Sequence, residues 1–295
     1  GSISITGDGD ADGDDGIDIK GSSVIQVVNG PLMLMGTGGD EADDTNQGID
    51  FYENSEIRST GTGSITLVGV GGAGTTEQPG VWISDAALVT SVIGDIQIMG
   101  TGGTTGDDNI GVIIGDHGVG AVVESTGAAM ITITGVGGNG NDSDGVLIAT
   151  AESQVRSAGG SITITGTSTV DDDGIEIEAG VTLAINATNA APLSITGTGS
   201  GTSVAVQIDS PIDSATGTVT ITALNGGTAT DDITFGVAGD VTSASGVVTI
   251  NADTAGDTGD VFMADGAVID AGTGQIDIDA DVNVTLGGLD TTTAV

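Results

Sequence analysis

Residues 130–135 read Met-Ile-Thr-Ile-Thr-Gly, and variants of this stretch recur about ten times along the chain of 295 residues. Neighbouring copies lie 26 to 35 residues apart. The second apolar residue of each copy falls at Ile5, Leu34, Leu67, Ile98, Ile133, Ile164, Ile195, Ile221, Ile250 and Ile278. Self-similarity at a near-constant spacing is typical of proteins that stack one supersecondary unit. We therefore expect strands in fixed register, joined by loops of variable length.

The unit at residues 130–160 shows the layout most clearly. Alternation in 131–134 puts both isoleucines on one face and both threonines on the other. A Gly/Asp-rich loop at 136–145 follows, and then two further short apolar stretches at 146–148 and 154–157. Three short strands in about thirty residues describe one coil of a parallel β-helix. Such a coil buries its apolar face only against neighbouring coils, about 4.8 Å away.

The second and third strands recur as regularly as the first. The second is expected at 17–19, 49–51, 81–83, 112–114, 146–148, 175–177, 206–208, 233–235 and 261–263, and the third near Val24, Ile57, Val89, Val123, Val155, Val181, Ile212, Val241 and Val268. The sequence therefore predicts an all-β, right-handed parallel β-helix (β-solenoid) of about ten coils of roughly thirty residues, with three short strands per coil. A β-propeller needs four strands per blade, and the leucine and asparagine signature of leucine-rich repeats is absent.

We expect residues 1–295 to form a single solenoid, with long acidic loops in 1–192 and shorter coils in 193–295. The unit that begins at Gln275 is expected to be incomplete. Neither end of the sequence shows a polar capping helix, and uncapped β-helix ends expose unpaired backbone groups. We therefore expect the chain to abut another copy end to end, or to be a segment of a longer array.

The charge of −39 comes from 42 acidic residues, of which 34 are aspartate, against three basic ones. Aspartate favours turns, so the acids are expected in loops rather than on helices. This charge excludes nucleic acid and anionic membrane surfaces as direct partners. No apolar run reaches the roughly 18 residues that span a bilayer, so no direct membrane insertion is expected. The chain has no cysteine, and therefore no disulfides.

The acidic loops suggest calcium as a cofactor, because Ca²⁺ takes six to eight oxygen ligands. Residues 8–13 read D-x-D-x-D-G, although Ile19 replaces the acid that closes an EF-hand loop. Solvated turn residues are the alternative interpretation of the other acidic loops. The candidate metal ligands are Asp8, Asp10, Asp12, Asp43, Asp44, Asp107, Asp108, Asp142, Asp144, Asp171, Asp172 and Asp173.

Catalysis is not expected. The one histidine is His117, and the three basic residues, Lys20, Arg58 and Arg156, belong to different coils. We interpret the basic residues as counter-charges to neighbouring acids.

Two further binding classes stay open. Carbohydrate sites usually stack sugar rings on aromatic side chains, and here only Tyr52 and Trp82 carry large polar aromatic groups; Trp82 is expected on the outer surface. Successive T-x-T-like pairs resemble those of some ice-binding solenoids, but Met33/Met35 interrupts the pattern; the pairs are Thr132/Thr134, Thr163/Thr165, Ser194/Thr196 and Thr220/Thr222.

The repeated [ST]-I-T-I-T-G strand, the Gly/Asp loop, the G-[IV]-x-[IV] strand and the V-x-S-x-x-G return resemble the β-strand-repeat regions of giant secreted bacterial surface proteins. These are the filamentous-haemagglutinin-like and adhesin-like proteins. The resemblance covers about residues 1–280 and implies an extracellular location at the bacterial cell surface. The leading hypothesis is a structural stalk, fibre subunit or adhesin. A carbohydrate-binding or carbohydrate-cleaving β-helix is the alternative, with surface polysaccharide as partner, and an ice-binding solenoid is a minor one.

Overall fold

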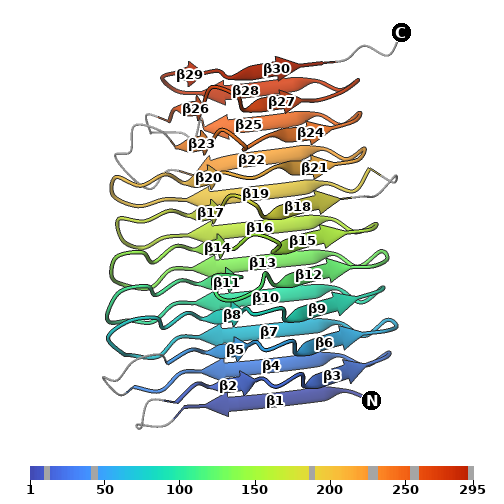
Figure 1. The fold of residues 1–295 in the computed structure, drawn as a ribbon, viewed down its shortest axis with the longest axis vertical. Coiled ribbons are helices and arrows are strands. Elements are labelled where there is room, and N and C mark those ends of the chain that lie inside the picture. Colours follow the sequence, from blue (N-terminus) through green and yellow to red (C-terminus); the bar gives the residue numbers. More distant parts are fainter. Residues whose placement is uncertain (10–13, 41–45, 186–189, 225–231, 253–258, 292–295) are drawn as a thin grey trace.

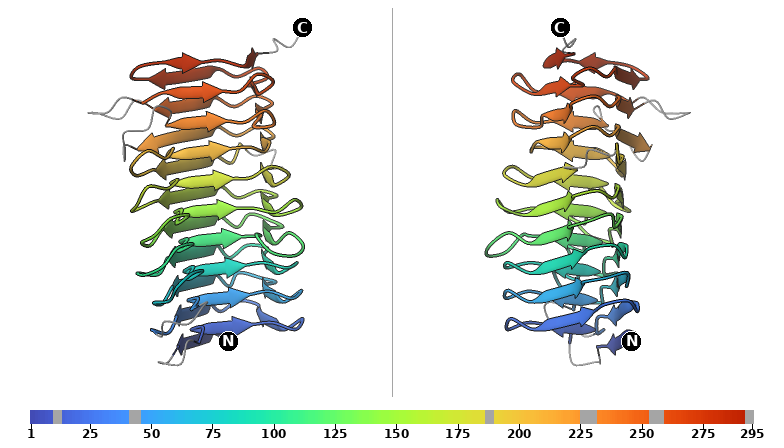
Figure 2. Two further views of the ribbon diagram at one scale, coloured as in Figure 1. Left: turned by 60° about the vertical axis from the view of Figure 1, so that its left-hand side comes forward. Right: turned by 90° about the vertical axis from the view of Figure 1, so that its right-hand side faces the viewer.

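The chain forms three parallel ten-stranded sheets that stack into a rod, with three strands in each coil (Figure 1). The computed structural model describes residues 1–9, 14–40, 46–185, 190–224, 232–252 and 259–291. Two further views show the same elongated stack from other sides (Figure 2). The prediction of a parallel β-helix is confirmed.

Sheet A contains the longest strands, most of them six residues long. Its strands are β1 (Ile3–Asp8), β4 (Leu32–Thr37), β7 (Ile65–Val70), β10 (Ile96–Thr101), β13 (Ile131–Val136), β16 (Ile162–Thr167), β19 (Leu193–Thr198), β22 (Val219–Leu224), β25 (Val248–Ala252) and β28 (Ile276–Ala280).

Sheet B follows sheet A in each coil and has strands of two or three residues. They are β2 (Ile17–Ile19), β5 (Ile49–Phe51), β8 (Val81–Ile83), β11 (Val112–Ile114), β14 (Val146–Ile148), β17 (Ile175–Ile177), β20 (Val206–Ile208), β23 (Ile233–Phe235), β26 (Val261–Met263) and β29 (Val284–Thr285).

Sheet C completes the coil. Its strands are β3 (Val24–Val27), β6 (Glu56–Ser59), β9 (Leu88–Ser91), β12 (Val122–Ser125), β15 (Gln154–Ser157), β18 (Thr182–Ile185), β21 (Ile212–Ser214), β24 (Val241–Ser243), β27 (Val268–Asp270) and β30 (Gly288–Asp290).

The core is one continuous apolar column inside the three sheets. Ile133 pairs with Ile98 on one side and Ile164 on the other, and all three are fully buried. These residues belong to one lane of sheet A, that is, a row of equivalent side chains that follow one another from coil to coil. The lane runs from Ile5 to Ile278 without a shift of register, as the sequence predicted. Each coil therefore buries its apolar side chains against the coils above and below it, because a lone coil has no other core.

The corner between sheets A and B explains the glycine of each motif. A Cβ on Gly135, in β13, would lie 1.9 Å from the carbonyl oxygen of Gly145, just before β14. Contacts this short do not occur between real atoms, so the two backbone segments meet only because a side chain is absent. The equivalent Gly100 has the same 1.9 Å approach to Gly111.

The prediction that the unit from Gln275 is incomplete is wrong. Strands β28, β29 and β30 pair in parallel with β25, β26 and β27 and complete a tenth coil. This coil was not recognised in the sequence because β29 has only two residues and β30, Gly-Leu-Asp, lacks the [IV]-x-[IV] alternation.

No element of the described residues is a helix that could cross a membrane.

Candidate functional site

The outer face of sheet B carries the most unusual run of side chains. The middle residue of each three-residue strand points outward, and the parallel register lines these residues up along the rod. In order from β2 to β20 they are Asp18, Asp50, Trp82, Ile113, Leu147, Glu176 and Gln207. Three apolar residues are thus flanked by acids on both sides.

The apolar residues form a second cluster outside the core. Trp82, Ile113 and Leu147 pack with Ile110 and Ala149, and all five are buried. The indole N–H of Trp82 donates a hydrogen bond to the carbonyl oxygen of Gly115 at 3.1 Å. This satisfies its polar atom in an apolar setting.

Trp82 is therefore outside the solenoid core, as expected, but it is not exposed. The ring of His117 lies over it, with the two ring centroids 4.9 Å apart and the planes tilted by 56°. Only 7% of Trp82 remains accessible. No local pattern indicates this packing, because His117 lies one coil and 35 residues away from Trp82.

An open groove of about 580 Å³ lies over this cluster. Its acidic walls come from four consecutive loops that connect sheet A to sheet B, and from β17 and the turn after β11. We call this site the acidic groove. It is lined by Glu77, Pro79, Trp82, Asp108, Ile110, Ile113, Asp116, His117, Asp142, Asp144, Leu147, Asp172, Asp173, Glu176, Glu178 and Ser203.

The carboxyl groups at the centre of the groove are hard to ionise. Burial, and then the neighbouring carboxylates of Asp173 and Glu176, raises the pKa of Asp144 to about 8. Burial and the carboxylate of Glu176 raise the pKa of Asp173 to about 7. Burial also raises the pKa of Glu176, with Glu178 and Asp209 adding to the effect. At neutral pH Asp144 therefore stays largely protonated and Asp173 about half protonated unless a cation is bound.

A second hollow adjoins the acidic groove and shares Glu77, Trp82 and His117 with it. Here burial, and then Asp15 and Asp18, raises the pKa of Asp50 to about 7. Lys20 forms an ion pair with Asp18 and lies 5.7 Å from the ring centroid of Tyr52.

The predicted metal ligands divide into three groups. Asp10, Asp12, Asp43 and Asp44 lie outside the described residues. Asp8 ends β1 and borders a separate hollow with Asp14, Asp15 and Asp18. The others lie in consecutive A–B loops, and the acidic groove brings five of them together: Asp108, Asp142, Asp144, Asp172 and Asp173.

Asp107 and Asp171 do not line the acidic groove. The Oδ1 of Asp107 accepts the backbone N–H of Asn141 at 3.0 Å, and the Oδ1 of Asp171 accepts the hydroxyl of Thr202 at 3.1 Å. Within the described part of the chain, no three acidic or histidine side chains converge closely enough to form a metal site as they stand.

Several aspartates have a structural role that was not predicted from the sequence: their carboxylates accept hydrogen bonds from backbone N–H groups of the next coil. Asp144 accepts the N–H of Asp173, and Asp173 accepts the N–H of Val204, both at 3.0 Å. Asp15 does the same for Gln47 at 3.0 Å. The available signal was an aspartate directly before the glycine of the second strand, as in 15–16, 144–145 and 173–174. A short carboxylate suits this role because it reaches the adjacent backbone without a flexible stem.

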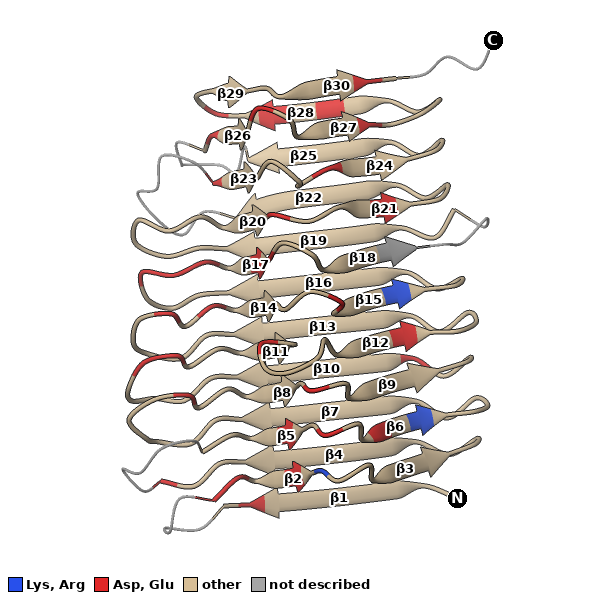
Figure 3. Cartoon of the chain, viewed as in Figure 1, with Lys and Arg blue, Asp and Glu red and all other residues tan. Residues whose placement is uncertain are grey.

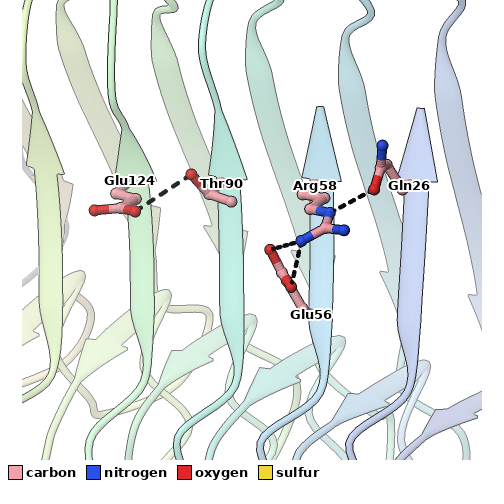
Figure 4. A network of polar contacts seen from close by, with 5 residues as sticks. All are labelled: Gln26, Glu56, Arg58, Thr90 and Glu124. Carbon is pink, nitrogen blue, oxygen red and sulfur yellow. Dashed lines mark hydrogen bonds and ion pairs between the residues drawn. The ribbon is translucent and has the colours of Figure 1, made fainter. Parts of the chain in front are cut away.

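The arginines lie on the outer face of sheet C. Figure 4 shows Arg58 between two neighbours: its Nε donates to Gln26 at 2.7 Å, and its Nη1 donates to both carboxylate oxygens of Glu56 at 3.1 and 3.2 Å. Arg156 pairs with Glu124 at 2.7 Å. The interpretation of these arginines as counter-charges is confirmed.

No protein-family model matches this chain, and neither the curated proteins nor the solved structures contain a match.

Proposed function

We propose that this chain is a non-enzymatic structural β-solenoid at the outside of a bacterial cell, serving as a stalk, fibre subunit or adhesin. The observation that carries the proposal is the continuous core of ten coils in unbroken register. Such a core makes a stiff spacer, because every coil is bonded to its neighbours along all three sheets. The extracellular placement rests on the resemblance to secreted bacterial repeat proteins.

Calcium is the proposed stabilising cofactor. Equivalent carboxylates in stacked loops are about 4.8 Å apart, and two unit charges at such a distance repel by several kcal/mol at an effective dielectric constant near 20. Asp108, Asp142, Asp144, Asp172 and Asp173 would supply oxygen ligands in the acidic groove. A divalent cation there would allow these carboxyl groups to ionise without mutual repulsion.

The proposed partner is another coil at each end of the rod. Ile5, in the first coil, is 39% exposed, whereas Leu34 beside it in the second coil is fully buried. In the last coil Leu289 is also exposed. A second copy, or further coils of a longer array, would cover these side chains and pair with the outermost strands.

The decisive experiment for calcium is the melting temperature in millimolar calcium, in magnesium, and in chelator at equal ionic strength. We expect calcium to raise Tm well above magnesium, and the double variant Asp172→Asn/Asp173→Asn to lose most of that difference. Asp213→Asn, on the exposed face of sheet C, is the matched control. Equal Tm values in all three solutions would eliminate specific calcium binding.

Electron microscopy of the native protein and antibody labelling of intact source cells test the structural role. We expect rods at the cell surface. Labelling confined to the cytoplasm would contradict the proposal.

The acidic groove favours one second candidate, a carbohydrate-binding module. Its open shape and apolar floor suit a neutral or amino sugar, while its charge disfavours acidic polysaccharides. Trp82 is the one tryptophan of the chain and lies in the floor, so its fluorescence reports directly on the groove. Saturable changes on titration with oligosaccharides, lost in Leu147→Glu, would support this role. An unchanged spectrum with every oligosaccharide would count against it.

A further inference from the structure

The outer face of sheet A is free of charge over eight consecutive strands, from β4 to β25. Every outward side chain there is Thr, Ser, Met, Val, Gln, Leu or Asn. Charged residues appear only at the ends of the sheet: Asp8 in β1, and Asp277 and Asp279 in β28. Figure 3 shows this face without red or blue between those ends.

The other two faces carry charged side chains. Sheet B presents Asp18, Asp50 and Glu176 outward. Sheet C presents acids and arginines side by side: Glu56, Arg58, Glu124, Arg156 and Asp213. Two copies that each carry a charge of −39 repel one another over most of their surfaces. Sheet A is the broad face where two copies approach with the least electrostatic cost.

This face also carries several exposed apolar side chains, most of them methionines. Four of the five methionines lie on it or just before it. Met33 and Met35 in β4 are 39% and 42% exposed, and Met130, just before β13, is 48% exposed. Met99 lies in the same lane as Met35, separated from it by Val68. Methionine is typical of adaptable contact surfaces, because its side chain is flexible and polarizable.

The size and regularity of the face suit a protein interface. Eight strands at about 4.8 Å extend about 38 Å, and six residues at about 3.3 Å extend about 20 Å. The face therefore covers about 750 Å², close to the roughly 800 Å² that each partner buries in a standard interface. The one-to-one register of these strands leaves no bulge to keep a flat partner away.

We propose that the outer face of sheet A is a self-association surface, and that its occupant is sheet A of a second copy of this chain. A two-fold axis parallel to the rod brings β4–β10 of one copy against β4–β10 of its partner. The methionine-rich halves then cover one another, and the threonine-rich halves do the same. This side-by-side contact is independent of the proposed end-to-end assembly and of calcium.

The test is sedimentation velocity of the whole chain over a range of protein and salt concentrations. We expect a reversible dimer of twice 28.4 kDa. Its affinity should rise with sodium chloride, because salt screens the repulsion between the acidic faces. Met35→Glu introduces a charge in the methionine-rich half, on β4, and Thr134→Glu introduces one near the middle of the face, on β13; each should weaken the dimer at least tenfold.

Thr182→Glu is the matched control, since Thr182 is an exposed strand residue on sheet C. It adds the same charge and should leave the dimer unchanged; circular dichroism and Tm establish that all three variants are folded. Three results would overturn the proposal: a monomer at every concentration in molar salt, equal weakening by Thr182→Glu, or open-ended growth that Met35→Glu does not affect. A monomer that shows thermal hysteresis would also overturn it and assign the face to ice.

Discussion

The carboxyl group of Asp144 accepts the backbone N–H of Asp173, one coil further along, at 3.0 Å. Asp144 is buried and Asp173 is half-buried, and the charge of Asp173 is one of the causes that raise the pKa of Asp144 in the acidic groove. One side chain therefore stabilises the stacking of two coils by hydrogen bonding and opposes it by repulsion when ionised. Proton or cation binding decides which effect is larger.

The stability of the metal-free protein should fall as pH rises. The pKa of Asp144 is about 8 in the folded chain, against an ordinary value of 3.8, and that of Asp173 is about 7. Between about pH 4 and pH 8 the folded state binds more protons than the unfolded state, so the free energy of unfolding decreases with pH. We expect a lower Tm at about pH 8.5 than at about pH 5.5, in chelator and constant salt. A Tm that rises over this range would contradict the assignment.

Asp144→Asn should remove part of that pH dependence. The amide oxygen still accepts the N–H of Asp173, but the side chain no longer ionises. The variant should therefore melt above the parent protein at alkaline pH and match it at about pH 5.5, where Asp144 is protonated. Asp213→Asn, on exposed sheet C, is the control and should leave the Tm difference between the two pH values unchanged. Equal effects of Asp144→Asn at both pH values would show that charge is not the cause.

Gly135→Ala should destabilise the protein strongly. The new Cβ would lie 1.9 Å from the carbonyl oxygen of Gly145, so the A–B corner must open. We expect a loss of about 1–3 kcal/mol or more, measured by urea denaturation. Ala223 in β22, which pairs with Gly197 in β19, occupies the equivalent position with a methyl group. The reverse change Ala223→Gly should cost only about 1 kcal/mol or less.

Two alanine substitutions in the same lane of sheet A should differ by their place in the stack. Ile164 is fully buried in an interior coil, whereas Ile278 in the last coil is only partly buried. Ile164→Ala should cost about 2–5 kcal/mol, and Ile278→Ala clearly less. Urea unfolding measures both. Equal losses would mean that the last coil packs as tightly as the interior ones.

Arg156→Met should have little effect. The ion pair between Arg156 and Glu124 is short, at 2.7 Å, but the arginine side chain is 44% exposed. Exposed pairs contribute about 0–1 kcal/mol, because water and salt screen them. Thermal unfolding in low and high salt checks this; a loss as large as that of Ile164→Ala would show that sheet C depends on its charges.

The lanes of the core were predictable from the sequence, because the alternation of a strand fixes which side chains face inward. Ile98, Ile133 and Ile164 could be aligned by eye, and the structure pairs them in that order. The second and third strands followed from the same repeat. A two-residue strand such as β29 carries too little alternation to be recognised.

The acidic groove was only partly predictable. The sequence indicates which loops are acidic, and stacking brings five of the predicted aspartates together. It does not indicate that Asp144 is buried or that it binds an amide of the next coil, because both depend on where the loops turn. The packing of His117 on Trp82 joins residues of different coils that no local pattern connects.

Because the register is unbroken, the length of the rod and the chemistry of its sides can change independently. The loop between sheets A and B spans 38–48 after β4 but only 168–174 after β16, yet the strands on either side keep the same pairing. An insertion in such a loop changes the girth of the molecule and its surface chemistry, but not its reach. Gain or loss of a whole unit changes the reach by one step of about 4.8 Å and leaves every chemical face at the same angle around the axis. Evolution can thus adjust how far this protein extends without altering what it presents along its sides.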